Sequence, residues 1–476
     1  MLSVVDMPEE TDLQSAKVVA IVGGGLGGAL CACFFAKHDI QVHLFELRPD
    51  IRTQKVVKGR SINMALSRRG RDALAYVDCE TTIVNNGIAM RARMIHDLDC
   101  TKHSIPYGTR PDHEILSIDR RVLNELLLTE ASRRPNINIH FQHKFVGWDE
   151  DNKIASFDDA SGNRVEFRAD AVIGYDGCHS AVRTAMMKTD AINVAQEYFD
   201  THYMEFCISP QSKQFAIEPN YLHIWPRHQF MLIALPNQDM SFTTTLFLPI
   251  SIFRKLKTAD DVLNFFGQYF PDAVSFIGTK EIVETFFSSK PQPLISTKCE
   301  PHATYRGDML LMGDAAHSMA PFYAQGMNSA FEDCIVLFDK LRENDFDLPK
   351  AFASYNDARV CDTHAIVDLS MYNHREMTHL VTLRSFHWRK KIDNFLYRLF
   401  PHWWIPLYTM VTFTRIPYHQ CMALRQRQDR TLQIARRIGY TLVGFLVARR
   451  FVWNTIKPFV VQFIADEVLP RLEIKK

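Results

Sequence analysis

The sequence predicts an α/β protein in which a parallel sheet is joined to an antiparallel sheet and to a helical C-terminal region. Three observations predict this arrangement: a strand, glycine turn, helix and strand near the N-terminus, two later glycine turns after apolar runs, and period-two alternation that gives way to helical periodicity. The chain of 476 residues is long enough for two or three structural units. We expect a discontinuous first domain, an antiparallel sheet domain, a helical region that closes a pocket, and a tail: residues 1–199 with 300–345, 200–299, 346–420 and 421–476.

The first observation lies in residues 17–46, where an apolar, β-branched run enters a glycine cluster and a second strand ends at Glu46. Gly23, Gly25 and Gly28 have the spacing of the dinucleotide fingerprint, in which residues without a Cβ make a tight turn and admit a pyrophosphate. The helix start offers N–H groups to phosphate, and Glu46 can accept hydrogen bonds from a ribose. The sequence therefore predicts a Rossmann-like unit with a bound dinucleotide.

Arginines are frequent after this unit. We single out five of those in the loop and helix pattern of residues 47–77, which could serve phosphates, and expect most to lie at the surface: Arg48, Arg60, Arg68, Arg69 and Arg71. Residues 90–96 alternate as a strand that holds Arg91 and Arg93 on one face. Because a guanidinium matches a carboxylate bidentately, this strand is a candidate anion clamp.

Further strands lead to a second glycine turn. Residues 115–129 predict a strand that passes into an amphipathic helix, with Arg120 at the junction. Residues 136–148 alternate as a strand and a later run returns, which predicts a β-ribbon feeding back into the parallel sheet. The returning run ends in the Gly-Tyr-Asp-Gly turn of residues 174–177, where Arg183 could hold the loop or meet a phosphate.

The middle of the chain changes character. Residues 200–299 alternate with period two between clusters of turn residues, which predicts an antiparallel meander whose one face could cover a ligand pocket. Residues 265–278 predict a helix with its aromatic side chains in the core.

The third glycine turn follows another apolar strand. Gly313 and Asp314 precede a glycine-containing loop and a helix that we expect over residues 328–341. Asp314 can accept hydrogen bonds from the hydroxyls of a sugar chain, and the helix start presents N–H groups to an electron-accepting ring edge. We expect His317 to support this loop, because no Ser/His/Asp or Cys/His set with a reason for catalysis is recognisable.

Helical patterns dominate from residue 348 onward. Asn373 and Met377 are four residues apart on one helix face, with Glu376 beside them. The apolar run of residues 438–448 is too short for a membrane-crossing helix, which needs about 20 apolar residues, so we expect two amphipathic or re-entrant pieces instead.

Charge and cysteine usage bear on the partners of the protein. Residues 375–476 contain 18 Lys and Arg against 6 Asp and Glu, although the whole chain carries only +1. Interleaved aromatic residues favour an anionic membrane surface over nucleic acid for this basic tail, and a solvated basic face is the alternative. The ten scattered cysteines predict reduced, buried thiols and no metal site. The first 16 residues lack Lys and Arg, so we expect neither a secretory signal nor a transit peptide.

The three turns occur in the order and at roughly the spacing of the single-component flavoprotein aromatic hydroxylases, whose fold is that of p-hydroxybenzoate hydroxylase. The chain resembles this family from residue 17 to about 420. The segments that carry the resemblance are GRSINMALSRRGR, MRARMIH, IPYGT, EPNYLHIWPR, MGDAAHSMAPF, QGMN, DLSMYN and IPLYTMVTF. The chain departs from the family at Ala324, where a glycine is usual, and the similarity fades after residue 420.

This resemblance implies non-covalent FAD, NADPH as reductant and O2 as co-substrate, with a flavin C4a-hydroperoxide delivering oxygen to an aromatic ring. By position, the implied FAD contacts are Gly23, Gly25, Leu26, Gly28, Phe45, Glu46, Leu47, Arg48, Ala65, Arg120, Phe145, Asp314, Met327 and Asn328.

Within the family, the same segments resemble the members that hydroxylate L-kynurenine to 3-hydroxykynurenine in tryptophan catabolism. The implied contacts to the substrate's carboxylate, amine and ring are Arg93, Tyr107, Asn373, Tyr408, Phe322 and Met377. The amino group on the ring of this substrate donates electrons to the ortho carbon, so a dedicated base is not demanded.

The resemblance also implies the cytosolic side of the mitochondrial outer membrane. Two alternatives stay open. One is a sister hydroxylase or epoxidase acting on another apolar substrate, and the other is a non-catalytic binding protein that keeps the FAD fold, as Rab escort proteins do.

Overall fold

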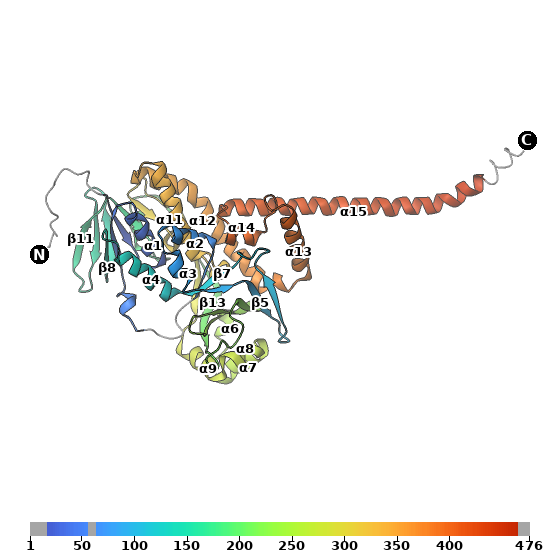
Figure 1. Ribbon diagram of the computed structural model, residues 1–476, viewed down its shortest axis with the longest axis horizontal. Helices are drawn as coiled ribbons and strands as arrows, with labels where there is room; N and C mark the ends of the chain where they lie inside the picture. The colour runs from blue at the N-terminus through green and yellow to red at the C-terminus, as the bar shows by residue number, and fades with distance from the viewer. Residues whose placement is uncertain (1–16, 56–62, 465–476) are drawn as a thin grey trace, which may run out of the picture. The chain divides into compact units, whose positions relative to one another are not determined.

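The computed structural model describes residues 17–55 and 63–464 (Figure 1). The chain divides into two units, Met1–Cys421 and Met422–Lys476. All the residues predicted to contact cofactor or substrate belong to the first unit.

Five parallel strands form the sheet predicted from the first glycine turn, in the order β18-β12-β1-β2-β8. Their bounds are β1 Val18–Val22, β2 Gln41–Glu46, β8 Ile137–Phe141, β12 Ala171–Gly174 and β18 Met309–Leu311. The predicted strand-helix-strand unit is confirmed, because α1 (Leu26–Ala36) connects β1 to β2. The strands β1, β12 and β18 are buried almost throughout, which explains their continuous apolar runs.

Alternate residues of these strands enter two different cores. On one face α1 packs against α4 (Arg120–Ser132) and α11 (Gly326–Glu343). On the other face lie a three-stranded ribbon and a short helix: β9 Lys144–Asp149, β10 Ile154–Asp158, β11 Arg164–Arg168 and α5 Ala181–Met186. The predicted ribbon is confirmed, but the single strand expected over residues 136–148 is wrong. The chain turns at Gln142, whose φ is +59°, so that β8 joins the parallel sheet and β9 opens the ribbon.

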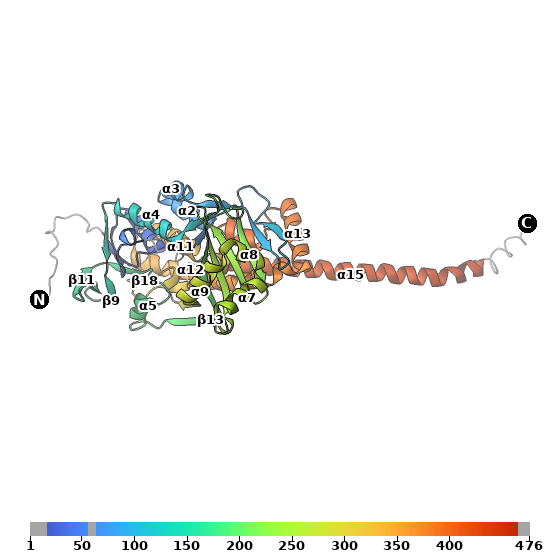
Figure 2. The same ribbon diagram turned by 90° about the horizontal axis from the view of Figure 1, so that it is seen from below.

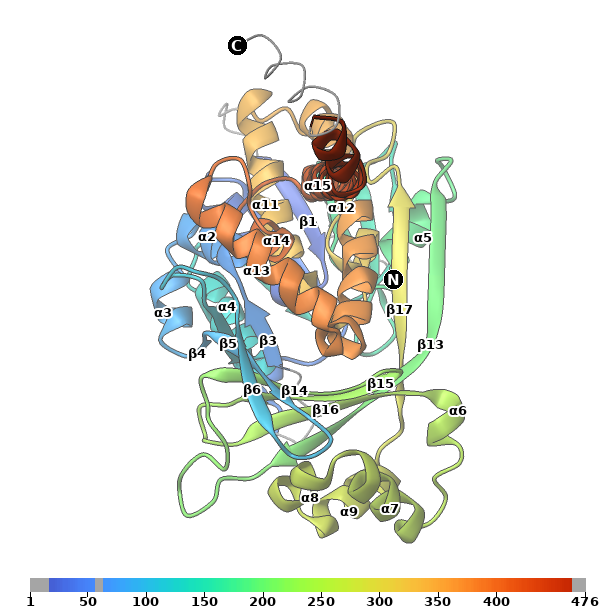
Figure 3. The same cartoon turned by 90° about the vertical axis from the view of Figure 1, so that its right-hand side faces the viewer.

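A seven-stranded sheet forms the second layer, in the order β17-β13-β16-β15-β14-β5-β6 (Figure 3). Its strands are β5 Ala92–His96, β6 Lys102–Pro106, β13 Asn193–Ile208, β14 Tyr221–Arg227, β15 Phe230–Pro236, β16 Phe242–Pro249 and β17 Gln292–Glu300. The antiparallel meander is confirmed for β14, β15 and β16, whereas β14 pairs in parallel with β5. The domain limits given above stay a prediction.

The outer face of this second sheet packs against four helices: α6 Ile250–Phe253, α7 Ala259–Tyr269, α8 Pro271–Ile277 and α9 Thr279–Ser288. Figure 2 shows α7, α8 and α9 close to this sheet. The single helix expected over residues 265–278 is therefore wrong. Pro271 lacks an N–H and starts a new helix, although Phe265, Phe266 and Phe270 are buried as expected.

The inner face of the second sheet packs against η2 Pro321–Tyr323 and α12 Leu348–Thr378. α14 Leu407–Phe413 packs on strands of the same sheet beside Tyr107. The other segments after β18 include α10 Asp314–His317, η3 Leu380–Thr382 and α13 Arg384–Leu399. A small antiparallel sheet and its helices link the two layers: η1 Ile51–Thr53, β3 Asn63–Leu66, α2 Arg68–Tyr76, α3 Glu80–Val84, β4 Ile88–Met90 and β7 Ile115–Asp119.

Two expectations about arginines are corrected. Arg69 is fully buried, whereas Arg48 and Arg68 are exposed as expected and Arg60 lies outside the described residues. Arg91 is exposed between β4 and β5, so the predicted strand breaks there and Arg93 enters the interior without it.

The expected burial of all cysteines is also wrong. All ten are free thiols, but Cys100 and Cys361 are exposed.

The C-terminal unit lies within one helix as far as it is described. α15 spans Tyr418–Phe463 and includes Pro458, so the expectation of two separate pieces is wrong. Within residues 17–55 and 63–464, no helix combines the length and apolarity needed to cross a bilayer.

Candidate functional site

The first glycine turn is built for a close ligand. Gly23 has a φ of +110°, and a Cβ on Gly28 would lie 1.9 Å from the carbonyl oxygen of Gly23. A Cβ on Gly25, in contrast, would meet no atom within 4 Å. Ala29 donates the first backbone hydrogen bond of α1, to Gly25, so the preceding N–H groups are available to a phosphate.

Glu46 stands beside this turn in a fixed orientation. Its Oε2 accepts a hydrogen bond from the Gly24 N–H at 2.8 Å, and its Oε1 accepts one from the Arg48 N–H at 2.9 Å. Each carboxylate oxygen keeps a further lone pair for a ribose hydroxyl. The turn and the acid therefore fit a dinucleotide.

The second glycine turn supports the third. Asp176 Oδ2 accepts hydrogen bonds from the N–H groups of Ala181 and Val182, and burial raises the pKa of this carboxyl. Arg183 donates to the carbonyls of Cys178 and Ala315, both at 2.6 Å. Of the two roles considered for Arg183, the structure shows the loop-holding one.

The third glycine turn carries the exposed side chain of Asp314 and is held in place by buried hydrogen bonds. Gly313 has a φ of +56° and places Asp314 at the start of α10, where its side chain is exposed. Beneath it, Asp333 Oδ2 accepts hydrogen bonds from the Gly313 N–H at 3.0 Å and from His317 Nε2 at 2.7 Å. The predicted supporting role of His317 is thus confirmed. Burial opposes ionisation of Asp333, but His317 and Arg359 outweigh it and hold its pKa well below the usual range.

The loop between η2 and α11 presents backbone N–H groups. Asn328 Oδ1 accepts from the Ser67 N–H at 2.8 Å, and its Nδ2 donates to the carbonyls of Ala65 and Ala324 at 2.9 and 2.8 Å. Its side chain is therefore engaged with protein, and the first turn of α11 offers N–H groups at Met327 and Asn328 for a cofactor. Ala324 adopts a left-handed conformation, φ +54° and ψ +36°, which explains why a glycine is usual there.

The other predicted FAD contacts are distributed around these turns. Leu26 starts α1, Arg120 starts α4 and is exposed, Leu47 is exposed, and Phe45 and Phe145 are buried against Phe157. Their contacts with a cofactor stay predictions.

Three of the residues expected to bind substrate meet between β5, β6 and α14. The Arg93 guanidinium carbon lies 4.7 Å from the Tyr408 ring centroid and 6.0 Å from that of Tyr107. The two tyrosine rings stack with centroids 5.4 Å apart. Chain segments more than 300 residues apart are thus brought around one buried cation.

The other three residues expected to bind substrate, Phe322, Asn373 and Met377, meet at η2 and α12. Asn373 Nδ2 donates to the Phe322 carbonyl at 2.6 Å and lies 3.3 Å from Met377 Sδ. Phe322 packs against Phe247 of the second sheet, with ring centroids 5.1 Å apart. The inner face of that sheet therefore covers this set, as the meander predicted.

Glu376 joins the two groups and was not assigned a role from the sequence. Its Oε1 lies 2.9 Å from Arg93 Nη1, and both side chains are largely buried. Burial disfavours the Arg93 cation, but Tyr408, Glu376 and Tyr107 raise its pKa, so it stays charged. The position of Glu376 three residues after Asn373 was the only sequence signal.

Four buried polar atoms at this place have no hydrogen-bond partner among the described residues. They are Arg93 Nε, Tyr107 Oη, Asn373 Oδ1 and His374 Nε2. An unsatisfied buried group costs about 1–3 kcal/mol, and such groups in a cluster are typical of a ligand site. Two of them are donors suited to a carboxylate, and the Asn373 oxygen is an acceptor suited to an ammonium group.

A cavity of about 500 Å³ elsewhere in the protein does not share these features. It is lined by Lys102, Gln214, Phe215, Ala216, Ile217, Glu218, Pro219 and Phe276. None of the predicted site residues lines it, and it contains none of the unpartnered buried atoms found around Arg93.

Comparisons with known proteins agree with this geometry. A family model described as an FAD binding domain matches residues 16–345. The chain is 46% identical over 432 residues to the kynurenine 3-monooxygenase of Caenorhabditis elegans, covering 87% of this chain and 93% of the relative. It is 45% identical over 439 residues to the kynurenine 3-monooxygenase of Sus scrofa, covering 92% of each.

Solved structures share the fold at low sequence identity. The tetrameric form of 2-methyl-3-hydroxypyridine-5-carboxylic acid oxygenase matches with a TM-score of 0.63 at 17% identity, over 77% of this chain and 93% of its own. A probable FAD-dependent monooxygenase of Pseudomonas aeruginosa, pqsL, matches with a TM-score of 0.58 at 18% identity, over 76% of this chain and 98% of its own.

The family match and the three glycine turns define an FAD-binding monooxygenase with the aromatic hydroxylase fold. Sequence identity to the relatives over most of their length identifies the family within this class: the chain belongs to the kynurenine 3-monooxygenase family.

Proposed function

We propose that this protein hydroxylates L-kynurenine to 3-hydroxykynurenine with bound FAD, NADPH as reductant and O2 as co-substrate. The observation that carries the proposal is the cluster of unpartnered buried atoms around the Arg93–Glu376 pair. This cluster is tied through the Phe322 carbonyl to the loop that precedes α11, so an amino acid bound there lies next to the flavin loop.

The cluster has the charges that an amino acid needs. Arg93 and the hydroxyl of Tyr107 donate to the carboxylate, while Glu376 and Asn373 accept from the ammonium group. Arg93 and Glu376 pair with each other in this structure, and a zwitterionic substrate offers each of them a new partner. Correct orientation matters because misplacing a reacting group by about 1 Å can cost on the order of a hundredfold in rate.

FAD supplies the electron transfer and oxygen activation when bound. The residues of the chain hold and shield the substrate. Phe322, Met377 and Phe247 supply the apolar wall around its ring and exclude water. The glycine turn, Glu46 and Asp314 hold the dinucleotide.

The deciding experiment identifies the product after incubation with L-kynurenine, NADPH and O2. Arg93→Met is compared with Arg91→Met, because Arg91 is a neighbouring arginine with an exposed side chain. We expect kcat/KM for L-kynurenine to fall by about 10- to 100-fold in Arg93→Met only, since a charge-assisted hydrogen bond contributes about 1.5–3 kcal/mol.

A decarboxylated kynurenine serves as the matched substrate. It should be a poor substrate of the native protein, and it should not distinguish Arg93→Met from the native protein. Equal stimulation of NADPH oxidation by kynurenine and by the decarboxylated compound would favour a sister hydroxylase. A purified protein without flavin absorbance would favour a non-catalytic binding protein.

We also propose that the C-terminal region binds the cytosolic face of the mitochondrial outer membrane. In support, α13 exposes an apolar stripe at helical spacing that consists of Trp388, Ile392, Phe395 and Leu399. Basic residues flank this stripe, and α15 exposes further aromatic and aliphatic side chains together with Arg449 and Arg450. Aromatic residues next to basic ones suit an anionic lipid surface, and the outer mitochondrial membrane is the location that family resemblance suggests.

A further inference from the structure

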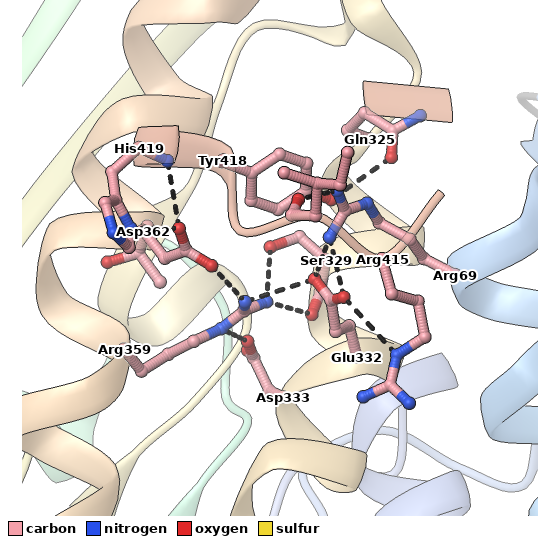
Figure 4. A network of polar contacts seen from close by, with 12 residues as sticks. Arg69, Gln325, Ser329, Glu332, Asp333, Arg359, Asp362, Arg415, Tyr418 and His419 are labelled. Atoms are coloured by element: carbon pink, nitrogen blue, oxygen red, sulfur yellow. Dashed lines mark hydrogen bonds and ion pairs between the residues drawn. The ribbon is translucent and has the colours of Figure 1, made fainter. Parts of the chain in front are cut away.

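A buried network of charged side chains lies beside the site, and its charged members are not among the predicted cofactor or substrate contacts (Figure 4). Glu332 of α11 joins it by pairing with Arg69 of α2 and with Arg359 of α12. Arg69 Nη1 lies 2.6 and 2.8 Å from the two carboxylate oxygens of Glu332. Both side chains are almost fully inaccessible to solvent, so the pair is strongly held.

Arg359 of α12 continues the network toward the third glycine turn. It donates from Nε to Asp333 at 2.8 Å and from Nη1 to Glu332 at 3.1 Å and Asp362 at 3.0 Å. Asp333 is the same carboxylate that binds the Gly313 N–H. The network is therefore continuous with the base of the loop that carries Asp314.

The other side of Arg69 holds the end of α14 and the residues that follow it. Its Nε donates to the Val411 carbonyl at 2.9 Å, and its Nη2 donates to the Ile416 carbonyl. The guanidinium carbon lies 3.9 Å from the ring centroid of Tyr418. Tyr418 in turn donates from its hydroxyl to Gln325 Oε1 at 3.2 Å.

Both ends of this segment reach the site. Tyr408, which stacks on Tyr107 and on Tyr323, lies on α14 only three residues before Val411. Gln325 is the residue immediately before α11, whose first turn is predicted to contact the flavin through Met327 and Asn328. One buried cation is thus linked to an element of the predicted substrate clamp and to the last residue of the loop between η2 and α11.

We propose that Arg69 is a positioning residue for both ligands: it sets Tyr408 through the Val411 and Ile416 carbonyls, and it sets Gln325 through Tyr418. This inference rests on the proposed function for its substrate half, and on FAD binding alone for its cofactor half. Arginine suits the task because its planar fork donates in several fixed directions at once, whereas lysine is a single point charge.

The test compares Arg69→Lys with Arg68→Lys. Arg68 is the adjacent arginine, exposed on the same helix and paired with Asp72 at 2.8 Å, so it controls for the chemistry of the change. Arg69→Lys keeps a cation opposite Glu332 but cannot satisfy the two carbonyls, Tyr418 and the carboxylate together.

Four quantities are measured for each variant: the unfolding temperature of the FAD-free protein, the FAD dissociation constant from flavin fluorescence, KM for L-kynurenine, and product formed per NADPH oxidised. In Arg69→Lys we expect KM to rise by about tenfold, FAD to bind several-fold more weakly, and product per NADPH to fall, as expected when one or two hydrogen bonds to a positioned group are lost. Arg68→Lys should match the native protein in all four.

A role limited to stability would lower the unfolding temperature of Arg69→Lys while leaving KM, FAD affinity and product per NADPH within twofold of the native values. That result overturns the proposal. If Arg69→Lys does not fold, Tyr418→Phe decides, because it removes one hydroxyl from the chain of contacts. It should weaken FAD binding and change flavin fluorescence, and unchanged values would overturn the proposal.

The two hypotheses fail in different ways. If the native protein forms no 3-hydroxykynurenine, the proposed function fails, and the FAD dissociation constants still test whether Arg69 positions the flavin loop. If the native protein forms product and Arg69→Lys behaves like Arg68→Lys, only the positioning role fails.

Discussion

Arg93 of β5 and Glu376 of α12 form a buried ion pair across 283 positions of the chain, with Nη1 2.9 Å from Oε1. Removing one partner of such a pair leaves an uncompensated charge in a place of low solvent access. Arg93 Nε has no hydrogen-bond partner among the described residues, so the hydrogen bonds of this ion pair are not all formed. An amino acid, which carries one charge of each sign, can supply the missing acceptor to Arg93 and a donor to Glu376.

Glu376→Gln tests the ammonium half of this arrangement. We expect KM for L-kynurenine to rise by about tenfold or more, because a charge-assisted hydrogen bond to the ammonium group is lost. A kynurenine analogue that lacks the α-amino group should not distinguish the variant from the native protein. Asp368→Asn on the exposed side of α12 is the control and should leave KM unchanged. Equal effects of Glu376→Gln on both compounds would contradict the assignment.

Lys390 lies beside the predicted substrate clamp, and its pKa predicts that substrate binding depends on pH. It donates from Nζ to the Pro106 carbonyl at 3.0 Å, beside Tyr107. Burial lowers its pKa to about 8, with Arg93 adding to the shift and Glu376 opposing it. Below that pH, Lys390 is a second cation near the clamp. We therefore expect KM for L-kynurenine to rise as pH increases through about 8, and the inflection to disappear in Lys390→Met.

The lowered pKa of Lys390 also makes the free energy of unfolding depend on pH. Between about pH 8 and the ordinary lysine pKa of 10.5, the unfolded chain binds a proton that the native protein does not, so the free energy of unfolding rises with pH in this window. The control is Lys391→Met, which replaces an exposed lysine whose Nζ lies 5.1 Å from the Trp388 ring centroid and should keep the inflection of KM near pH 8. If that inflection persists in Lys390→Met, another group causes it.

Ala324→Gly should stabilise the protein. Ala324 has φ +54°, a conformation that costs a residue with a Cβ about 1–2 kcal/mol. Glycine avoids this cost, but it loses about 0.5–1 kcal/mol more conformational entropy than alanine on folding. We expect a net gain of about 0.5–1 kcal/mol in the urea unfolding of the FAD-free protein. Ala358→Gly, at an exposed position within α12, should instead destabilise by about 1 kcal/mol. A loss of stability in Ala324→Gly would show that the left-handed conformation of Ala324 does not carry the expected cost.

Removal of residues 422–476 should release the protein from anionic vesicles. Each basic residue near such a surface contributes about 1 kcal/mol, so co-sedimentation with phosphatidylserine vesicles should fall at least tenfold and depend on salt. Replacing Trp388 and Phe395 by serine in the full chain tests α13 separately. If the truncated protein, shown to be folded by its thermal transition, still sediments as the full chain does, then the tail is not the anchor.

Sequence by itself determined the local elements on which the site is built. The glycine turn with Glu46, the Gly313-Asp314 loop and the helix expected over residues 328–341, which the structure extends to Gly326–Glu343, were all predictable, because their chemistry depends on residues close together in the chain. Resemblance to the family placed Arg93, Tyr107, Asn373 and Tyr408 in one pocket, and the structure brings them into two adjoining groups.

Tertiary structure alone decided which charges are buried. Arg68 and Arg69 are neighbours with the same side chain, yet one is exposed and the other is buried in the network. Helical spacing puts Arg69 on the face of Ala73, but it cannot reveal the partners of a cation there, because the carbonyls of Val411 and Ile416 that hold Arg69 come from more than 340 positions away. The partnership of Glu376 with Arg93 was hidden for the same reason: the free energy of a buried ion pair depends on what encloses it, and the enclosing residues meet only when the chain has folded.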